Sequence, residues 1–164
     1  MFQKKKKVFT VNEIKRKIEQ YCIYQDRCHK EVAQKMRDYD LIPEAQEMIL
    51  LDLMKDNFLN EERFAKSFAR GKFRIKKWGK QRIVRELKFK DISAYNIKTA
   101  LKEIDEQDYI STIYTITENR NEVISEPNLY KRKRKLIDFL MRKGFESELI
   151  YKVVEETTAN ISNK

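Results

Sequence analysis

A pattern of apolar residues that recurs about every fifty positions constrains the fold of this chain more than any other feature. Each copy opens with two apolar residues five apart, continues through a segment with helical spacing, and contains a later apolar pair with the same separation. The opening pairs are Phe9 and Ile14, Leu59 and Phe64, and Ile104 and Tyr109; the later pairs are Met36 and Leu41, Leu87 and Ile92, and Leu140 and Phe145. Self-similarity at this period is typical of stacked repeats.

The spacing within each copy indicates helices. Ile14, Ile18, Tyr21 and Cys22 stand at i, i+4, i+7 and i+8, which places them on one face of a helix. Only three glycines and two prolines occur among 164 residues, which disfavours glycine-rich β architectures. We therefore predict an all-α protein with about nine helices, three in each copy.

Local signals predict where several helices begin and end. Asn60 and Ser93 are suited to N-caps, since their short polar side chains accept from the first free backbone N–H groups. Pro43 is tolerated in a first turn, and Gly144 follows two basic residues as a left-handed helix stop.

The repeat predicts an elongated, curved array of three tandem three-helix repeats. A unit of about fifty residues is barely stable alone, so neighbouring units must share cores. The segment 118–129 breaks the periodicity and is predicted to be a flexible joint. The expected limits are a basic, disordered tail at 1–10 that includes Lys4 to Lys7, repeats at 11–58, 59–108 and 109–156, and a C-terminal tail at 157–164.

Charge is arranged in blocks along the chain, and the net charge is +10. Residues 70–90 carry ten basic residues and one acidic residue, whereas residues 40–62 carry one basic and seven acidic residues. Residues 129–143 form another basic block, with seven basic residues and one acidic residue. Such blocks favour a polyanionic partner. The alternative is a solvated helical face that is neutralised by the neighbouring acidic block.

The basic block at 70–90 contains the only tryptophan. Trp78 and Gly79 predict a turn between two helices, the second of which begins near Lys80. The N-terminus of that helix is expected to meet a phosphate, and Ile75, with Ile83 and Leu87, is expected to face the core. Trp78 either packs in the turn or stacks on an exposed base. The candidate contacts to nucleic acid, without sequence preference, are Arg70, Lys72, Arg74, Lys76, Lys77, Lys80, Arg82, Arg132, Lys133 and Arg134.

Residues for catalysis or metal binding do not form a recognisable motif. Cys22 and Cys28 are predicted to be small buried hydrophobic residues, and the single histidine, His29, is badly placed to activate its neighbour. The acidic run 105–108 is expected to open a helix. We predict no enzyme activity, no metal, no cofactor and no membrane segment, and two cysteines fit a cytoplasmic, reducing setting.

Several segments resemble the RecX family of bacterial regulatory proteins. The middle repeat carries the most specific likeness, and the cysteine-containing first repeat resembles the version found in Bacteroidetes. The matching segments are Tyr21-Cys22 and 25–32 in the first repeat, 58–65, 68–72, 78–83 and Glu86-Leu87 in the second, and Lys135-Leu136, Phe139-Leu140, 143–145 and Ile150 in the third.

The resemblance implies a monomeric, non-enzymatic protein that binds the filament of RecA recombinase on single-stranded DNA. It implies inhibition of ATP hydrolysis, strand exchange and co-protease activity, together with an affinity for single-stranded DNA and with double-stranded DNA as a further candidate. The alternative function is that of a general nucleic-acid-binding helical module that acts without RecA.

Overall fold

The structure, a computed structural model, describes residues 7–161, so Lys4, Lys5 and Lys6 of the predicted tail lie outside the described residues. Within residues 7–161 the chain forms nine α-helices and a terminal 3-10 helix, and no strand. They are α1 (Val11–Tyr24), α2 (His29–Met36), α3 (Pro43–Lys55), α4 (Glu61–Lys76), α5 (Lys80–Phe89), α6 (Ala94–Leu101), α7 (Glu106–Val123), α8 (Leu129–Lys143), α9 (Ser147–Thr158) and the 3-10 helix Ala159–Ile161.

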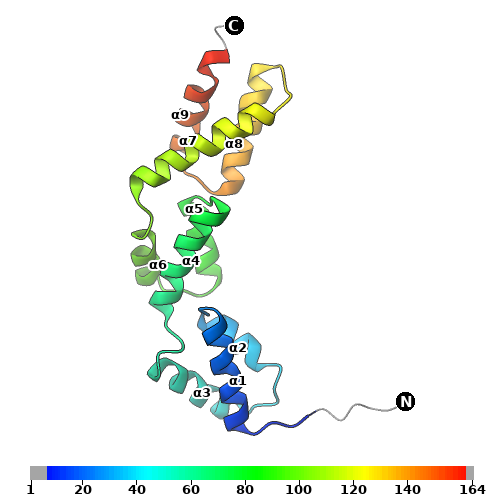
Figure 1. Cartoon of the computed structure of the whole chain (residues 1–164), viewed down its shortest axis with the longest axis vertical. Helices are drawn as coiled ribbons and strands as arrows, with labels where there is room; N and C mark the ends of the chain where they lie inside the picture. The colour runs from blue at the N-terminus through cyan, green and yellow to red at the C-terminus, as the bar shows by residue number, and fades with distance from the viewer. Residues whose placement is uncertain (1–6, 162–164) are drawn as a thin grey trace, which may run out of the picture.

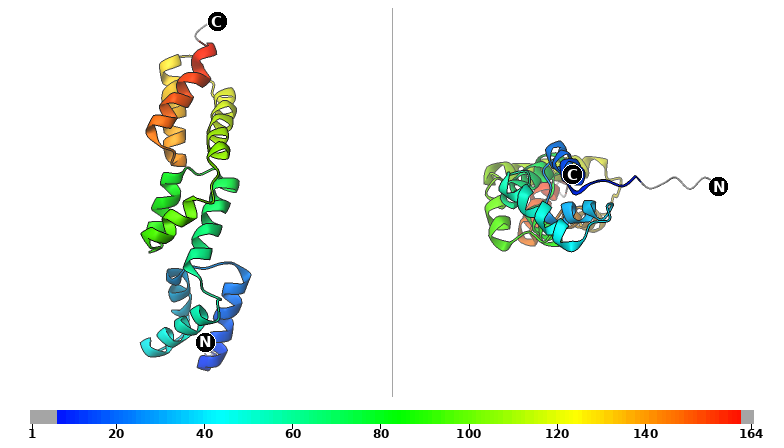
Figure 2. Two further views of the ribbon diagram at one scale, coloured as in Figure 1. Left: turned by 90° about the vertical axis from the view of Figure 1, so that its left-hand side faces the viewer. Right: turned by 90° about the horizontal axis from the view of Figure 1, so that it is seen from below.

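The helices form three consecutive triads, α1–α3, α4–α6 and α7–α9, which follow one another along the long axis (Figure 1). Two further directions of view confirm that the molecule is long in one dimension and compact in the other two (Figure 2). The all-α, elongated helical array is therefore confirmed. The repeat limits stay a prediction; the limit expected between residues 108 and 109 falls in the first turn of α7.

Short polar side chains fix the helix starts. The Asn60 and Ser93 side chains accept hydrogen bonds from the N–H groups of Arg63 and Asn96, as predicted for N-caps. Asp105 caps α7 in the same way, which confirms that the acidic run opens a helix. Pro43 is the first residue of α3, and Gly144 ends α8 with a φ of 90°.

The predicted flexible joint at 118–129 is wrong in its first half, because α7 extends to Val123. Only 124–128 separate α7 from α8. The Arg132 guanidinium donates hydrogen bonds to the backbone carbonyls of Asn121, Ile124 and Glu126 at 2.7 to 3.0 Å. One side chain thus satisfies carbonyls at the end of α7 and in the following loop, which ties the loop to α8.

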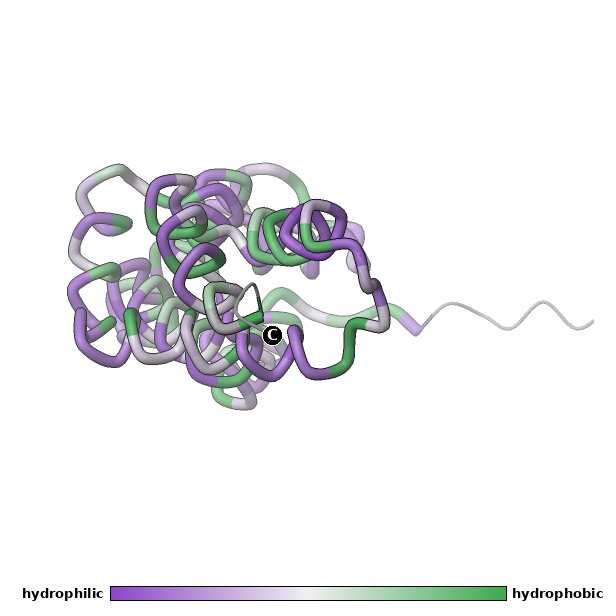
Figure 3. Tube along the Cα trace, turned by 90° about the horizontal axis from the view of Figure 1, so that it is seen from above, coloured by the Kyte–Doolittle hydropathy of each residue, from purple (hydrophilic) through white to green (hydrophobic). Residues whose placement is uncertain are grey.

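Apolar positions alternate with polar ones along the whole helical trace (Figure 3), and each of the helices α1–α9 buries two or more residues. The buried residues form two separate cores. The first triad has a core of its own, made by Ile14, Ile18, Cys22, Val32, Met36, Ile49, Leu53 and Leu59. A second core runs without interruption through α4–α9. The second and third triads therefore share a core, as expected for small repeats, whereas the first does not.

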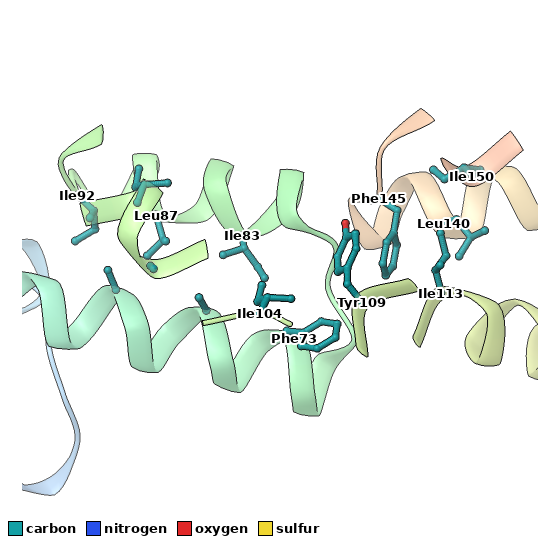
Figure 4. Packing of buried hydrophobic residues seen from close by; sticks show 14 of the residues in the cluster. Phe73, Ile83, Leu87, Ile92, Ile104, Tyr109, Ile113, Leu140, Phe145 and Ile150 are labelled. Carbon is teal, nitrogen blue, oxygen red and sulfur yellow. The ribbon is translucent and has the colours of Figure 1, made fainter. Parts of the chain in front are cut away.

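The junction between the second and third triads, here called the second junction, is apolar and tightly packed. The Tyr109 ring lies between Phe73 and Phe145, with centroid distances of 5.9 and 5.2 Å (Figure 4). Backbones also approach closely, since a Cβ at Gly79 would lie 2.3 Å from the Gly144 carbonyl oxygen. Only glycine fits there.

The junction between the first and second triads, here called the first junction, is mainly ionic. Asp26 accepts from Arg63 at 2.8 Å, and Lys90 lies 3.0 Å from Glu31. Lys30 donates to the Phe89 carbonyl and lies 4.3 Å from the centre of that ring. Cys28, the N-cap of α2, is the residue of the first triad that is buried in the second core.

Candidate nucleic-acid interface

Half of the ten predicted contact residues are engaged by partners in their own chain. Arg70, Lys80 and Lys133 form ion pairs with Glu103, Glu106 and Glu155 at 3.0, 2.7 and 2.9 Å. Arg132 holds the loop after α7, and Arg82 donates to the Arg142 carbonyl at 3.0 Å. The other five, which have no carboxylate partner within 4.0 Å among the described residues, are Lys72, Arg74, Lys76, Lys77 and Arg134.

The expectation that the N-terminus of α5 meets a phosphate is wrong. The backbone N–H groups of Gly79, Lys80 and Gln81 are used at the second junction: Gly79 donates to the Lys143 carbonyl at 2.7 Å, and Gln81 donates to the Gly144 carbonyl at 3.0 Å. The Lys80 N–H donates to the Tyr109 hydroxyl at 3.0 Å. The third triad therefore occupies the place that the sequence suggested for an anion.

Side chains around the turn between α4 and α5 are half-buried or exposed. Trp78 is half-buried and packs edge-on against Phe68, with centroids 6.3 Å apart, which agrees with a packing role. Lys72 and Arg82 lie 4.9 and 4.1 Å from the centre of the Trp78 ring. Ile75, expected to face the core, is 77% exposed, because it lies on the opposite face of α4 from the buried Phe73.

Four cations gather near this tryptophan at the second junction. We call Lys72, Lys76, Arg82 and Lys143 the cation cluster. Lys72 and Arg82 share Trp78, and the Lys143 amine donates to the Lys76 carbonyl at 2.9 Å. Within residues 7–161, no member of the cluster has a carboxylate oxygen within 4.0 Å of its charged group. Positive charge here is uncompensated, in contrast to the ion pairs elsewhere on α4 and α5.

The titration of Lys143 reflects this surplus charge. Desolvation lowers the pKa of Lys143 from its usual value, and the charges of Arg82 and Lys76 lower it further. A bound phosphate would favour the charged amine and counteract both effects. The charge pattern includes Lys143 in the basic block 129–143 but does not distinguish it as a candidate contact. The Lys143 amine contacts the Lys76 carbonyl, which is 67 positions away in the sequence, so local spacing does not reveal the contact.

A shallow groove of about 220 Å³ leads away from the cation cluster along α4. Phe64, Phe68 and Gly71 are among the residues that line it, together with Lys72 and Lys76 of the cluster. Its far end is made by Gln25 and Asp26 of the first triad. The groove therefore joins cationic groups to apolar and aromatic surface, a combination that suits a nucleotide chain.

Arg74, Lys77 and Arg134 are exposed. Arg74 and Lys77 stand close to Lys76 of the cation cluster at the end of α4. Lys77 adopts a left-handed conformation, φ 57°, at the end of α4, which directs the chain into the Trp78 turn. Arg74 and Lys76 also favourably face the negative end of the α4 dipole.

The cysteines are buried, as predicted, at 5% and 0% exposure for Cys22 and Cys28. Burial raises the pKa of both thiols, which opposes formation of the nucleophilic thiolate. Within residues 7–161 no three histidine, cysteine, aspartate or glutamate side chains are grouped so that they could hold a metal ion. None of the helices in this range is long and apolar enough to cross a membrane.

Models of known protein families match two parts of this chain. Residues 60–101 match the family model described as RecX, second three-helix domain, and residues 107–154 match RecX, third three-helix domain. The two matches together cover more than half of the chain. The first triad lies outside both matches.

Curated relatives share this likeness over most of the chain. A regulatory protein RecX from Lactobacillus gasseri is 26% identical over 136 residues, which are 83% of this chain and 50% of the relative. Another, from Clostridium perfringens, is 28% identical over 131 residues, 79% of this chain and 59% of the relative. The chain thus spans about half the length of the curated relatives it matches.

A solved structure has the same fold. The crystal structure of RecX from Lactobacillus salivarius superposes with a TM-score of 0.78 at 22% identity, and the match covers 91% of this chain and 97% of that one.

Proposed function

Because this chain belongs to the RecX family, we propose that it is a non-enzymatic regulator that binds filaments of RecA recombinase on single-stranded DNA. Binding lowers ATP hydrolysis, strand exchange and co-protease activity of RecA. The protein acts in the cytoplasm as a monomer. RecA is proposed as the partner because the sequence resembles the RecX family.

The cation cluster is the observation that carries the nucleic-acid part of the proposal. Its four charges have no acidic partner in the described part of the chain, so a phosphate is the ligand that best compensates them. Contacts of this kind follow the backbone of DNA and carry no sequence information. Trp78 and the groove along α4 supply apolar surface beside the charges.

The elongated shape supports the filament part of the proposal. Three triads in a row present a long surface, which suits a polymeric ligand better than a small molecule (Figure 1). A protein that spans neighbouring filament subunits can oppose the movement between them that accompanies ATP turnover. This mechanism requires no catalytic residue of its own.

The first experiment measures the affinity for single-stranded DNA at several salt concentrations. Neutralising three of the cluster lysines, in the variant Lys72→Gln/Lys76→Gln/Lys143→Gln, removes about three phosphate contacts and should reduce the slope of log K against log salt by about 2. The matched control, Lys66→Gln/Arg70→Gln/Lys133→Gln, removes the same formal charge from ion-paired cations. For this control we expect a clearly smaller change in the slope of log K against log salt. Equal slopes for the two triple variants would place the DNA contacts elsewhere.

The second experiment measures ATP hydrolysis by RecA on single-stranded DNA with added protein. The proposal expects slower hydrolysis with the native chain and weaker inhibition with the cluster variant. Unchanged hydrolysis, combined with equal binding to bare and RecA-coated DNA, would favour the alternative of a nucleic-acid-binding module that acts without RecA.

A further inference from the structure

The outer face of α3 is apolar, although the fold does not require it to be. Ile49 and Leu53 point into the core of the first triad. Met48, Leu51 and Met54 stand three residues apart, and their positions on the helix centre on the side opposite that core. They are 57%, 57% and 47% exposed, and Ile42, directly before the helix, is 65% exposed.

The other triads provide an internal comparison for this face. Ile42, Ser93 and Glu146 are the N-caps of the third helix in each triad. Six and nine residues after the cap, where α3 has Met48 and Leu51, the second triad has Thr99 and Lys102, and the third has Lys152 and Glu155. The same positions are thus polar in both other copies of the repeat.

Ile42 is unfavourable for local structure. An N-cap position favours serine, threonine, asparagine or aspartate, and isoleucine is among the poorest choices. The Ser93 side chain does accept from the Asn96 N–H, whereas Ile42 provides no such bond. Ile42 is thus an exposed apolar residue at a position that disfavours it, and Met48 and Leu51 are exposed apolar residues at positions that are polar in the other triads. Together they indicate a role outside the fold.

Two acidic residues border the N-terminal half of this apolar face, and Lys55, one turn after Leu51, borders its C-terminal end. Glu44 lies one turn before Met48, and Glu47 lies one turn before Leu51, so both carboxylates share its side of α3. Both are exposed, and neither has a basic group within 4.0 Å among the described residues. A DNA backbone or an anionic membrane surface would be repelled here.

We propose that the outer face of α3 is a protein-docking surface for a segment with apolar side chains flanked by lysines or arginines. The carboxylates of Glu44 and Glu47 favour a basic residue of the partner at the N-terminal half of the face. The two methionines supply flexible, polarisable apolar contacts. This inference rests on the proposed function in one respect, because it assigns that segment to the recombinase of the filament. The cation cluster then binds DNA while α3, at the end of the molecule opposite the C-terminus, binds protein (Figure 1).

The test uses the full chain with RecA filaments on single-stranded DNA and with bare single-stranded DNA as probes. The variant Met48→Thr/Leu51→Lys gives α3 the residues that α6 has at these positions, so the helix should still form. We expect its filament affinity to fall by about tenfold or more, since two apolar contacts are lost, while its affinity for bare DNA does not fall. The control Thr99→Gln/Lys102→Gln changes the same positions of α6 and should leave filament affinity unchanged.

A second variant, Glu44→Gln/Glu47→Gln, tests the charge of the partner. It should weaken filament binding at low salt and approach the native affinity at high salt, because screening removes the contribution of exposed charges. Circular dichroism of each variant verifies that the helices are retained.

The outcomes separate the two proposals. Filament binding by Met48→Thr/Leu51→Lys equal to that of the native chain would overturn the docking surface and leave the proposed function intact. Failure of the native chain to distinguish RecA-coated from bare DNA would overturn the proposed function, and with it the assignment of α3 to the recombinase.

Discussion

The Tyr109 hydroxyl offers the sharpest test of how the second junction is held. It accepts from the Lys80 N–H at 3.0 Å and donates to the Glu146 carboxylate at 2.7 Å. Tyr109 is 1% exposed, and its ring lies between two phenylalanines. The variant Tyr109→Phe keeps the ring and removes only the hydroxyl.

The expected cost follows from the groups that lose a partner. The Lys80 N–H and the Glu146 carboxylate both lose a hydrogen bond at a half-buried position, and an unsatisfied group of this kind costs about 1–3 kcal/mol. We expect the free energy of unfolding to fall by about 2 kcal/mol. For a cooperative unit of about a hundred residues, that corresponds to a decrease in Tm of about 10 °C.

Thermal and urea unfolding followed by circular dichroism measure this change. Tyr114 provides a matched control on the same helix, since its hydroxyl also donates to a glutamate, Glu156, but at the surface. The variant Tyr114→Phe should change stability by no more than about 0.5 kcal/mol. A loss for Tyr109→Phe no larger than that for Tyr114→Phe would refute the argument that this hydroxyl holds the two triads together.

Two further predictions follow from the same structure. Burial, and next the hydrogen bond to Glu146, raises the pKa of Tyr109 above its usual value near 10. The neutral hydroxyl therefore stabilises the fold fully below about pH 10, and this contribution is lost as the pH rises further. In urea unfolding, the stability difference between the native chain and Tyr109→Phe should be constant below about pH 9 and should narrow as the pH rises above about 10. Gly71 lies inside α4, and a Cβ added there would meet no atom within 4 Å beyond its own stretch of helix. The variant Gly71→Ala should therefore raise the free energy of unfolding by about 0.5–1 kcal/mol. A lower free energy of unfolding for this variant in urea would contradict the prediction.

The sequence predicted those features that depend on neighbouring residues. The caps at Asn60 and Ser93, the stop at Gly144 and the repeat of buried residues all arise from short-range patterns, and all were predictable. The phosphate site at the N-terminus of α5 was predicted wrongly, because the groups that occupy it come from Tyr109, Lys143 and Gly144. Contacts between residues tens of positions apart leave no trace in local spacing.

Contacts between distant residues also limit how well the candidate site can be predicted from the sequence. The basic block identified α4 and α5 correctly as the region with surplus charge, but counting cations could not separate Lys72 and Lys76 from Arg70 and Lys80, which are paired with glutamates. That distinction depends on where the acidic residues of other helices fall.

The difference between the two junctions has a mechanical consequence. Half-buried, solvent-accessible ion pairs such as Arg63–Asp26 contribute little energy and tolerate small changes in distance, whereas interlocked aromatic rings and touching backbones do not. When the molecule must follow a ligand of a different pitch, bending is least costly beside Arg63. Residues 61–158 then behave as a stiff bar, and α1–α3 as an arm that pivots at its end.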